Sequence, residues 1–296
     1  MSVMTNNLNI LSAEARTILK KFRDEQTRDS HLIINLWNSV LMDNCHKLGD
    51  ELWLVYEQVC AAALDCQRFD TAELCIQALD NKFPKSIRVR RLKGMLYEAR
   101  EEYTDAEEEY NSILEKDETN MYAKKRKIAI LKARQKISEA IHSLNDYLKS
   151  FMTDYEAWNE LCDLYLSQLD YNNAAFCLEE LIMYNPHNHL YHQKYAEIRY
   201  TQGGNENIEL ARTYFAQAVK LNPNNLRALY GFFLSSSYLA VSSNKGVKDK
   251  QLNQKYSAWA AEQIQNKYES QQPESQLKET KVIECIEKLL DSLQAN

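Results

Sequence analysis

The feature of this sequence that most restricts its fold is a spacing that recurs at nearly constant intervals. An alanine is followed by one large residue four positions later and by a further core-type residue at seven, and in three copies by a proline at twelve. The leading alanines are Ala72, Ala106, Ala140, Ala174 and Ala211, so the intervals are 34, 34, 34 and 37 residues. A fixed period of this length indicates stacked copies of one supersecondary unit.

A period near 34 is typical of tetratricopeptide-type helix pairs. The first helix of such a pair carries apolar residues at spacings of three and four, as in the series Trp158, Leu161, Cys162 and Tyr165. The second helix starts at the small alanine, where the two helices approach closely, and the late proline ends it. A single pair cannot bury its apolar faces, so stability comes from stacking. The sequence therefore predicts an all-α fold, a right-handed α-solenoid with atypical capping helices.

Composition agrees with this fold and bounds the setting of the chain. Only 6 glycines and 4 prolines occur in 296 residues, which leaves little punctuation for strands and turns. The net charge of −6 disfavours a nucleic-acid binder. The 7 cysteines form no CxxC pair, which fits a reducing compartment better than a disulfide scaffold. The N-terminus has no signal-peptide pattern, and the apolar run at 228–241 is too short to span a bilayer, so a cytosolic protein is expected.

The repeat register predicts an order of segments along the chain. Capping helices occupy 1–52, a degenerate repeat or cap occupies 226–270, and a C-terminal amphipathic helix lies in 271–296, with its apolar side in 277–293. Two polar stretches, 201–207 and 241–254, are expected to be loops. The five repeats between the caps are 53–86, 87–120, 121–154, 155–188 and 189–225.

Charged residues at groove positions are the candidate partner contacts. Positions two, five, nine and twelve of each first helix are expected to line a concave groove, which is basic in the second and third repeats and acidic or neutral in the fourth. Such a groove suits an extended partner segment of opposite charge asymmetry. The alternative is that these charges only keep the surface soluble. The predicted contacts are Arg88, Arg91, Lys125, Arg126, Asn159 and Asp163, with His187 and Asn188 at a turn contact.

Evidence for catalysis is missing from the motifs. The sequence has no phosphate-binding glycine loop, no GxSxG and no HExxH, and the acidic run 101–110 has the spacing of a solvated helix face. His187, His189 and His192 crowd one repeat junction and would be the centre of a metal-dependent enzyme. The alternative is a polar turn between repeats, and it is favoured because no nearby Asp, Glu or Cys completes a ligand set. We therefore predict no catalytic, cofactor-binding or metal-binding residue.

The repeat sequences also resemble a known family. The stretches RVRRLKGMLYEAREEYTDAEEEYNSILEKDETN and ELARTYFAQAVKLNPNNLRALYGFFL are similar to the subunit 2 family of the endoplasmic-reticulum membrane protein complex, and the likeness covers roughly residues 30–240. The resemblance implies a non-catalytic repeat scaffold without a cofactor, held peripherally on the cytoplasmic side of the endoplasmic-reticulum membrane. Its partners would be the membrane-embedded subunits and a soluble subunit of that complex, which inserts tail-anchored and multipass proteins; no nucleic acid or small-molecule substrate is implied.

A free cytosolic adaptor for chaperones or signalling proteins is the alternative function. One group of such adaptors holds chaperone tails with a two-carboxylate clamp, which needs Lys and Asn at groove positions of the first repeat. Glu57 and Ala61 stand there instead, which lowers this alternative.

Overall fold

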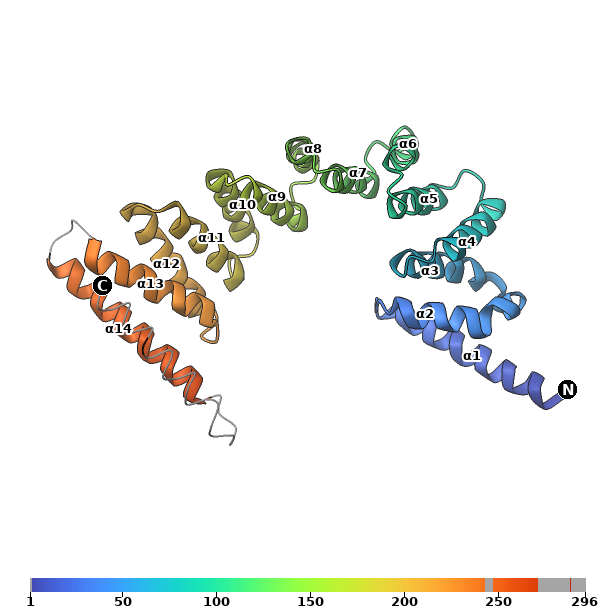
Figure 1. Cartoon of the computed structure of the whole chain (residues 1–296), viewed down its shortest axis with the longest axis horizontal. Helices are drawn as coiled ribbons and strands as arrows, with labels where there is room; N and C mark the ends of the chain where they lie inside the picture. Colours follow the sequence, from blue (N-terminus) through green and yellow to red (C-terminus); the bar gives the residue numbers. More distant parts are fainter. Residues whose placement is uncertain (1, 243–246, 271–287, 289–296) are drawn as a thin grey trace. The chain divides into compact units, whose positions relative to one another are not determined.

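The computed structural model of the chain describes residues 2–242, 247–270 and 288, and its elements are helices (Figure 1). No β-strand occurs among these residues, so the prediction of an all-α fold is confirmed. The chain divides into two compact units, Met1–Lys136 and Ile137–Asn296, called unit 1 and unit 2. The predicted amphipathic helix at 277–293 lies outside the described residues, apart from position 288.

Unit 1 is a cap followed by helix pairs. In each pair the buried leading alanine, Ala72 or Ala106, lets the second helix pack closely on the first. The first helices of the pairs are α3, α5 and α7, and the second helices are α4 and α6 (Figure 1). The elements are α1 (Ser2–Asp24), α2 (Ser30–Leu36), the π-helix η1 (Trp37–Leu41), the 3-10 helix η2 (Met42–Glu51), α3 (Leu52–Asp65), α4 (Phe69–Lys82), α5 (Ile87–Ala99), α6 (Tyr103–Leu114) and α7 (Met121–Ala133).

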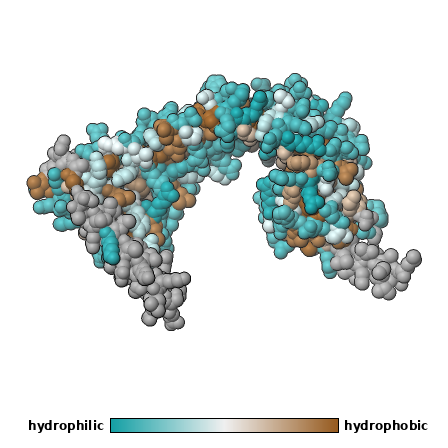
Figure 2. Space-filling model, viewed as in Figure 1, coloured by the Kyte–Doolittle hydropathy of each residue, from teal (hydrophilic) through white to brown (hydrophobic). Residues whose placement is uncertain are grey.

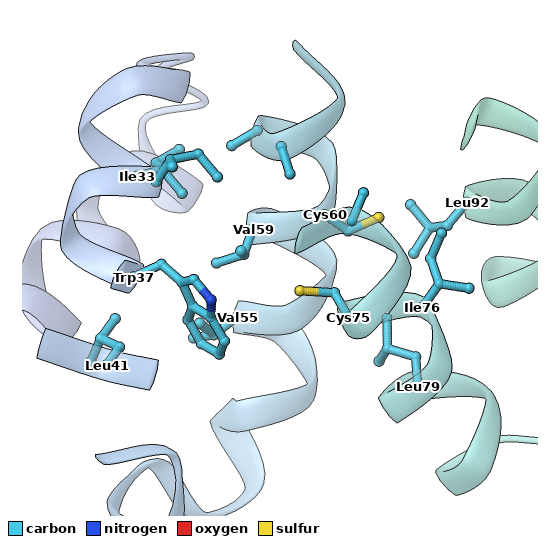
Figure 3. Close-up of a cluster of buried hydrophobic side chains, with 14 of the residues drawn as sticks. Ile33, Trp37, Leu41, Val55, Val59, Cys60, Cys75, Ile76, Leu79 and Leu92 are labelled. Carbon is cyan, nitrogen blue, oxygen red and sulfur yellow. The ribbon is translucent and has the colours of Figure 1, made fainter. Parts of the chain in front are cut away.

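The cap buries the apolar face that the first pair would otherwise expose. Ile33 and Trp37 of α2 and η1 point toward Val55 and Val59 of α3 (Figure 3). The Trp37 ring meets the edge of Tyr56 at 5.3 Å between centroids. Each large apolar side chain buried in this way contributes roughly 2 kcal/mol. The apolar segment at 32–41 therefore packs on α3, the first helix of the first pair.

Acid is expected to loosen the attachment of this cap. Arg28 donates from Nε to Oδ2 of Asp65 at 2.7 Å, and this bond together with Ser30 keeps the pKa of Asp65 below its ordinary value. A lowered folded-state pKa stabilises the fold above the unfolded-state pKa near 4 and loses that contribution as the pH falls through the folded-state value. The pair is partly exposed, so we expect a loss of only about 0.5 kcal/mol. Urea unfolding at pH 6 and pH 3 measures it. R28A should show a shallower fall between these pH values, and an unchanged fall would contradict the assignment.

Unit 2 repeats the same arrangement and ends in a longer pair. Phe215 of α12 and Phe233 of α13 are buried in one apolar cluster with Ile264 of α14, which joins the last helices. The first helices are α9, α11 and α13. The elements are α8 (Ile137–Ser150), α9 (Tyr155–Ser167), α10 (Tyr171–Tyr184), α11 (His189–Gln202), α12 (Asn205–Leu221), α13 (Leu226–Ser242) and α14 (Val247–Ser270).

The loop predicted at 201–207 is wrong in extent. Helix α11 continues through Gln202 and α12 begins at Asn205, so Gly203 and Gly204 alone join them. Both glycines have positive φ, 73° and 82°, which lets them reverse the chain in two residues. The three extra residues of this repeat therefore lengthen α12, which has 17 residues, instead of forming a loop.

The linker predicted at 241–254 is also largely helical. Helix α14 begins at Val247, which includes the charged stretch at 248–250 that we expected in a loop. Asn253 is buried and accepts a hydrogen bond from Arg212 of α12, so its polar group is satisfied inside the fold. Polarity alone misled the prediction because a polar residue of this stretch, Asn253, is buried against a polar partner on α12.

A left-handed residue follows the first helix of five successive pairs. Gln67, Glu101, Gln135 and Leu169 have φ of 56°, 62°, 59° and 58°, and Gly203 takes the next place with φ 73°. These positions are 34 residues apart. At the four non-glycine positions the backbone N–H of the left-handed residue donates to the carbonyl three residues earlier, and the following N–H donates to the carbonyl five residues earlier. This is the Schellman motif, which pairs the last carbonyl groups of a helix.

Two helix crossings leave no room for a side chain on the first helix. A Cβ at Gly94 of α5 would stand 2.6 Å from Cζ of Tyr110 on α6. A Cβ at Gly231 of α13 would stand 2.3 Å from Cε1 of Phe215 on α12. Real Cβ atoms essentially never make contacts this short, so at both sites glycine lets an aromatic ring lie against the helix backbone.

Four buried thiols are expected to resist labelling in the folded protein. Burial raises the pKa of Cys60, Cys75 and Cys177 to about 12 and that of Cys162 to about 11, so almost no reactive thiolate exists at neutral pH. With a disulfide reagent at pH 7.5 and peptide mass mapping, the half-buried Cys45 and Cys66 should react before these four. Modification of the four at the rate of urea-unfolded protein would show that their sites are open.

Candidate partner-binding face

In unit 1 the predicted contacts lie on the first helices. We call the surface formed by Glu57, Arg88, Arg91 and Tyr122 the first-helix face of unit 1; these residues come from α3, α5 and α7. Arg88 and Arg91 both donate to the carboxylate of Glu57, the second through Nη2 at 3.1 Å. The guanidinium of Arg91 also lies 5.2 Å from the centroid of the exposed Tyr122 ring. Two guanidinium groups share one carboxylate here, which leaves one positive charge in excess.

Arg126 of α7 is half-buried and bonds to Glu98 of α5. Its guanidinium donates from Nε to Oε1 of Glu98 at 2.9 Å, and the hydroxyl of buried Tyr110 donates to the same oxygen at 2.5 Å. Burial and the nearby Glu98 charge raise the pKa of the Tyr110 hydroxyl, so it stays a donor. Burial alone would lower the pKa of Arg126, but the interactions with Glu98 and Tyr110 outweigh this effect, so the pKa of Arg126 is raised. This geometry assigns Arg126 to the joint between neighbouring pairs.

In unit 2 the predicted contacts meet a residue that sequence reasoning missed. Lys194 of α11 donates to Oδ1 of Asp163 at 2.7 Å and to Oδ1 of Asn159 at 3.1 Å, both on α9. One repeat later, Arg227 of α13 donates from Nε to Oε1 of Glu197 on α11 at 2.5 Å. The charges of neighbouring first helices therefore pair with each other in unit 2 as they do in unit 1.

The histidine-rich junction is a folded turn. His187 is exposed, and Asn188 caps α11 by accepting from the N–H of Leu190 at 3.0 Å. The ring nitrogens of His189 lie 3.0 and 2.9 Å from the side-chain amides of Asn222 and Asn225.

His192 stands apart from the other two histidines of this junction. It is buried against the Tyr214 ring at 5.8 Å between centroids, with Nε2 2.9 Å from the Pro186 carbonyl. The three rings thus have separate neighbours, and the described residues hold no group of three or more metal-ligating side chains.

The predicted residues fall into four groups, one of which is the turn of His187 and Asn188 described above. Arg88 and Arg91 converge on Glu57, and Asn159 and Asp163 converge on Lys194. Lys125 lies half-buried on α7 beside Arg126 in the sequence. The sequence does contain a signal for the paired residues that were missed, because opposite charges stand about one repeat apart. The separations are 34 residues for Glu57 and Arg91, 31 for Asp163 and Lys194, and 30 for Glu197 and Arg227.

Comparison with known proteins agrees with this architecture. The family model described as the EMC2 TPR-like repeat domain matches residues 73–217. The chain is 49% identical over 269 residues to ER membrane protein complex subunit 2-A of Xenopus laevis, with 91% of each chain covered. It is 33% identical over 258 residues to ER membrane protein complex subunit 2 of Dictyostelium discoideum, with 83% of this chain and 79% of that protein covered.

A solved structure shows the same fold at low sequence identity. The C-terminal part of a TPR repeat-containing protein from Cytophaga hutchinsonii matches with a TM-score of 0.57 and 14% identity, covering 80% of this chain and 93% of that one. The predicted α-solenoid of tetratricopeptide-type helix pairs is confirmed. Within the described residues, none of the helices combines the length and apolar character needed to cross a bilayer. On the strength of its identity to curated relatives along most of both chains, this protein belongs to the subunit 2 family of the ER membrane protein complex.

Proposed function

We propose that this protein is a non-catalytic scaffold subunit of the endoplasmic-reticulum membrane protein complex. The observation that carries the proposal is the 49% identity to subunit 2-A of Xenopus laevis across 91% of both chains. A match that covers 91% of both chains argues against a different role built on one shared module. Family resemblance implies that the complex inserts tail-anchored and multipass proteins, and that this subunit works peripherally on the cytoplasmic side of the membrane.

The helix pairs supply the mechanism of the proposed scaffold. Within each unit, stacked pairs expose a continuous surface, because each pair is tied to the next by apolar contacts and charge pairs. A partner segment can then be bound without ordering the scaffold first, which lowers the entropy cost of assembly. Membrane-embedded subunits would offer their cytosolic segments to this surface, and a soluble subunit would bind beside them.

The candidate contacts keep a role in this proposal despite their internal pairs. The side chain of Arg88 is 67% exposed and that of Asp163 is 61% exposed, so both have donor or acceptor capacity left for a partner. Arg91, Lys125, Asn159 and the turn residues His187 and Asn188 remain proposed contacts. Arg126 is the weakest of the set, since reversing its charge would disturb the fold as well as any interface.

Copurification tests the function. The tagged full chain is captured from detergent-solubilised membranes, and every copurifying protein is identified and quantified. Recovery of a fixed set of membrane subunits in near-equal amounts is expected. Recovery of chaperones alone, or of nothing in a fixed ratio, would replace the proposal with the free-adaptor function.

A further inference from the structure

An open cleft of about 310 Å³ enters unit 1 between α3, the end of α4 and the start of α5. Its walls are largely apolar, and Trp53, Leu54 and Phe83 stand at its mouth. Figure 2 shows hydrophobic residues reaching the surface of unit 1 among hydrophilic ones. Apolar side chains that converge on a concave site, rather than standing singly, are typical of a binding surface.

Ring contacts join side chains that line the cleft to each other and to Lys82. The Trp53 ring meets the edge of Phe83 at 5.6 Å between centroids, and Lys82 Nζ lies 5.6 Å from the Trp53 centroid. Leu54 remains 45% exposed and Phe83 42% exposed. The open volume of about 310 Å³ is large enough for one bulky apolar side chain. An aromatic or aliphatic anchor in such a pocket is the usual centre of a protein interface.

The polar edge of the cleft places arginine side chains beside a carboxylate. Arg88 lines the cleft beside Glu57, and the Glu57 carboxylate accepts hydrogen bonds from both Arg88 and Arg91. The lining itself contains one cation, Arg88, and two carboxylates, Glu57 and Asp50, and two further cations lie just outside it: Arg91 on Glu57 and Lys82 over the Trp53 ring. A guanidinium has five N–H donors, and the bond to Glu57 runs through Nη2 of Arg88, so donors remain for a second carboxylate.

The cleft continues into the first-helix face of unit 1. Beyond Arg88 come Arg91 and the Tyr122 ring, which is 63% exposed. The order along this track is an apolar cleft, an exposed guanidinium, and a second guanidinium stacked on an aromatic ring. A basic segment would meet like charges at each step after the cleft, whereas an acidic one would meet complementary charges.

We propose that this track binds an acidic segment of a partner protein, with one bulky apolar side chain in the Trp53–Leu54–Phe83 cleft and adjacent carboxylates on Arg88 and Arg91. The inference rests on the proposed function, because it assigns a surface to one of the partner segments. It adds the chemical class of that segment, an apolar anchor flanked by Asp or Glu.

The test uses a phage-displayed library of random twelve-residue peptides, selected on the immobilised full chain. Enriched peptides should carry Asp or Glu within a few positions of a bulky apolar residue. Their fluorescein-labelled forms are then titrated by fluorescence anisotropy. R88E and L54Q should each weaken binding at least tenfold, and R88Q should weaken it less than R88E.

A matched control separates the cleft from surface charge in general. Arg28 pairs with Asp65 on the same unit, its side chain is 79% exposed, and it does not line the cleft. R28E should change binding less than twofold. Circular dichroism on each variant confirms that the helices are retained, so that a weaker titration reports the surface and not unfolding.

Several results would overturn the inference. In the selection, they are enrichment of basic peptides or no enrichment at all. In the titration, they are acidic peptides whose affinity is unchanged by R88E and L54Q. Binding to phosphatidylserine vesicles that depends on Arg88, in place of peptide binding, would also overturn it. The tagged R88E and L54Q chains should also recover fewer membrane subunits than R28E. If all variants recover equal amounts, the proposed function stands and this inference fails; if the unaltered chain recovers none, the proposed function itself fails.

Discussion

Replacing Gly231 by alanine should lower the free energy of unfolding by about 2–3 kcal/mol, although alanine is normally the better helix former by about 1 kcal/mol. The added Cβ would stand 2.3 Å from Cε1 of the Phe215 ring, and that side chain is only 2% exposed. Either the ring or α13 must move, and both belong to the cluster that joins the last helices of unit 2. Urea unfolding followed by circular dichroism measures the loss.

A double substitution shows whether the clash is the cause. G231A combined with F215L removes the ring edge that the new methyl group meets, so the pair should lose less stability than the sum of the two single changes. G94A, which meets the Tyr110 ring at 2.6 Å, should behave in the same direction. If G231A is neutral or stabilising, the close approach of α12 and α13 is not as tight as described.

Replacing Arg126 by methionine should cost about 2 kcal/mol, because it leaves the Glu98 carboxylate, 13% exposed, without its counter-charge. The expected cost lies below that of a fully buried pair, since the Arg126 side chain is itself 38% exposed. Methionine keeps most of the volume of the aliphatic stem, so the loss reports the charge and its hydrogen bonds.

Two comparisons isolate this effect. The double variant R126M/E98Q removes the stranded charge while the glutamine oxygen still accepts from Tyr110, so it should be more stable than R126M. R134M, which breaks the more exposed pair with Glu107, should cost less than R126M. Equal losses for R126M and R134M would mean that the Tyr110–Glu98–Arg126 cluster adds nothing beyond a surface ion pair.

The fold could be predicted from the sequence because the 34-residue period reflects both the local helix pattern and the packing of one helix on the next. Ala72, Ala106 and Ala174 are buried because a helix crossing leaves room for nothing larger, and the same requirement makes them visible as a pattern. The left-handed turns were not readable in the same way. Gln67, Glu101 and Leu169 carry none of the usual turn signals, because the Schellman bonds and the packing of the next helix impose their conformation.

The site was readable only in part. Positions and charges of Arg88, Arg91, Asn159 and Asp163 follow from the register, but charge alone does not distinguish a partner contact from a contact with the next repeat. That distinction depends on side-chain conformation. The structure shows that Glu57 reaches Arg91 and that Lys194 reaches Asp163, so these charges contact the neighbouring repeat. The apolar cleft was missed because Trp53 and Phe83 are 30 residues apart and meet only after α3 and α4 have paired.

The left-handed turns also offer a route to engineering heat resistance. An L-residue in this conformation costs about 1–2 kcal/mol relative to glycine, and glycine recovers part of that after its own entropy cost in the unfolded chain. Gln67, Glu101, Gln135 and Leu169 adopt this conformation where the fifth copy already has Gly203. A chain with glycine at all four positions would be expected to melt several degrees higher while every proposed contact side chain stays unchanged. This sequence uses glycine at only one of these five turns, so the stabilisation can be added to a recombinant scaffold without redesigning its surfaces.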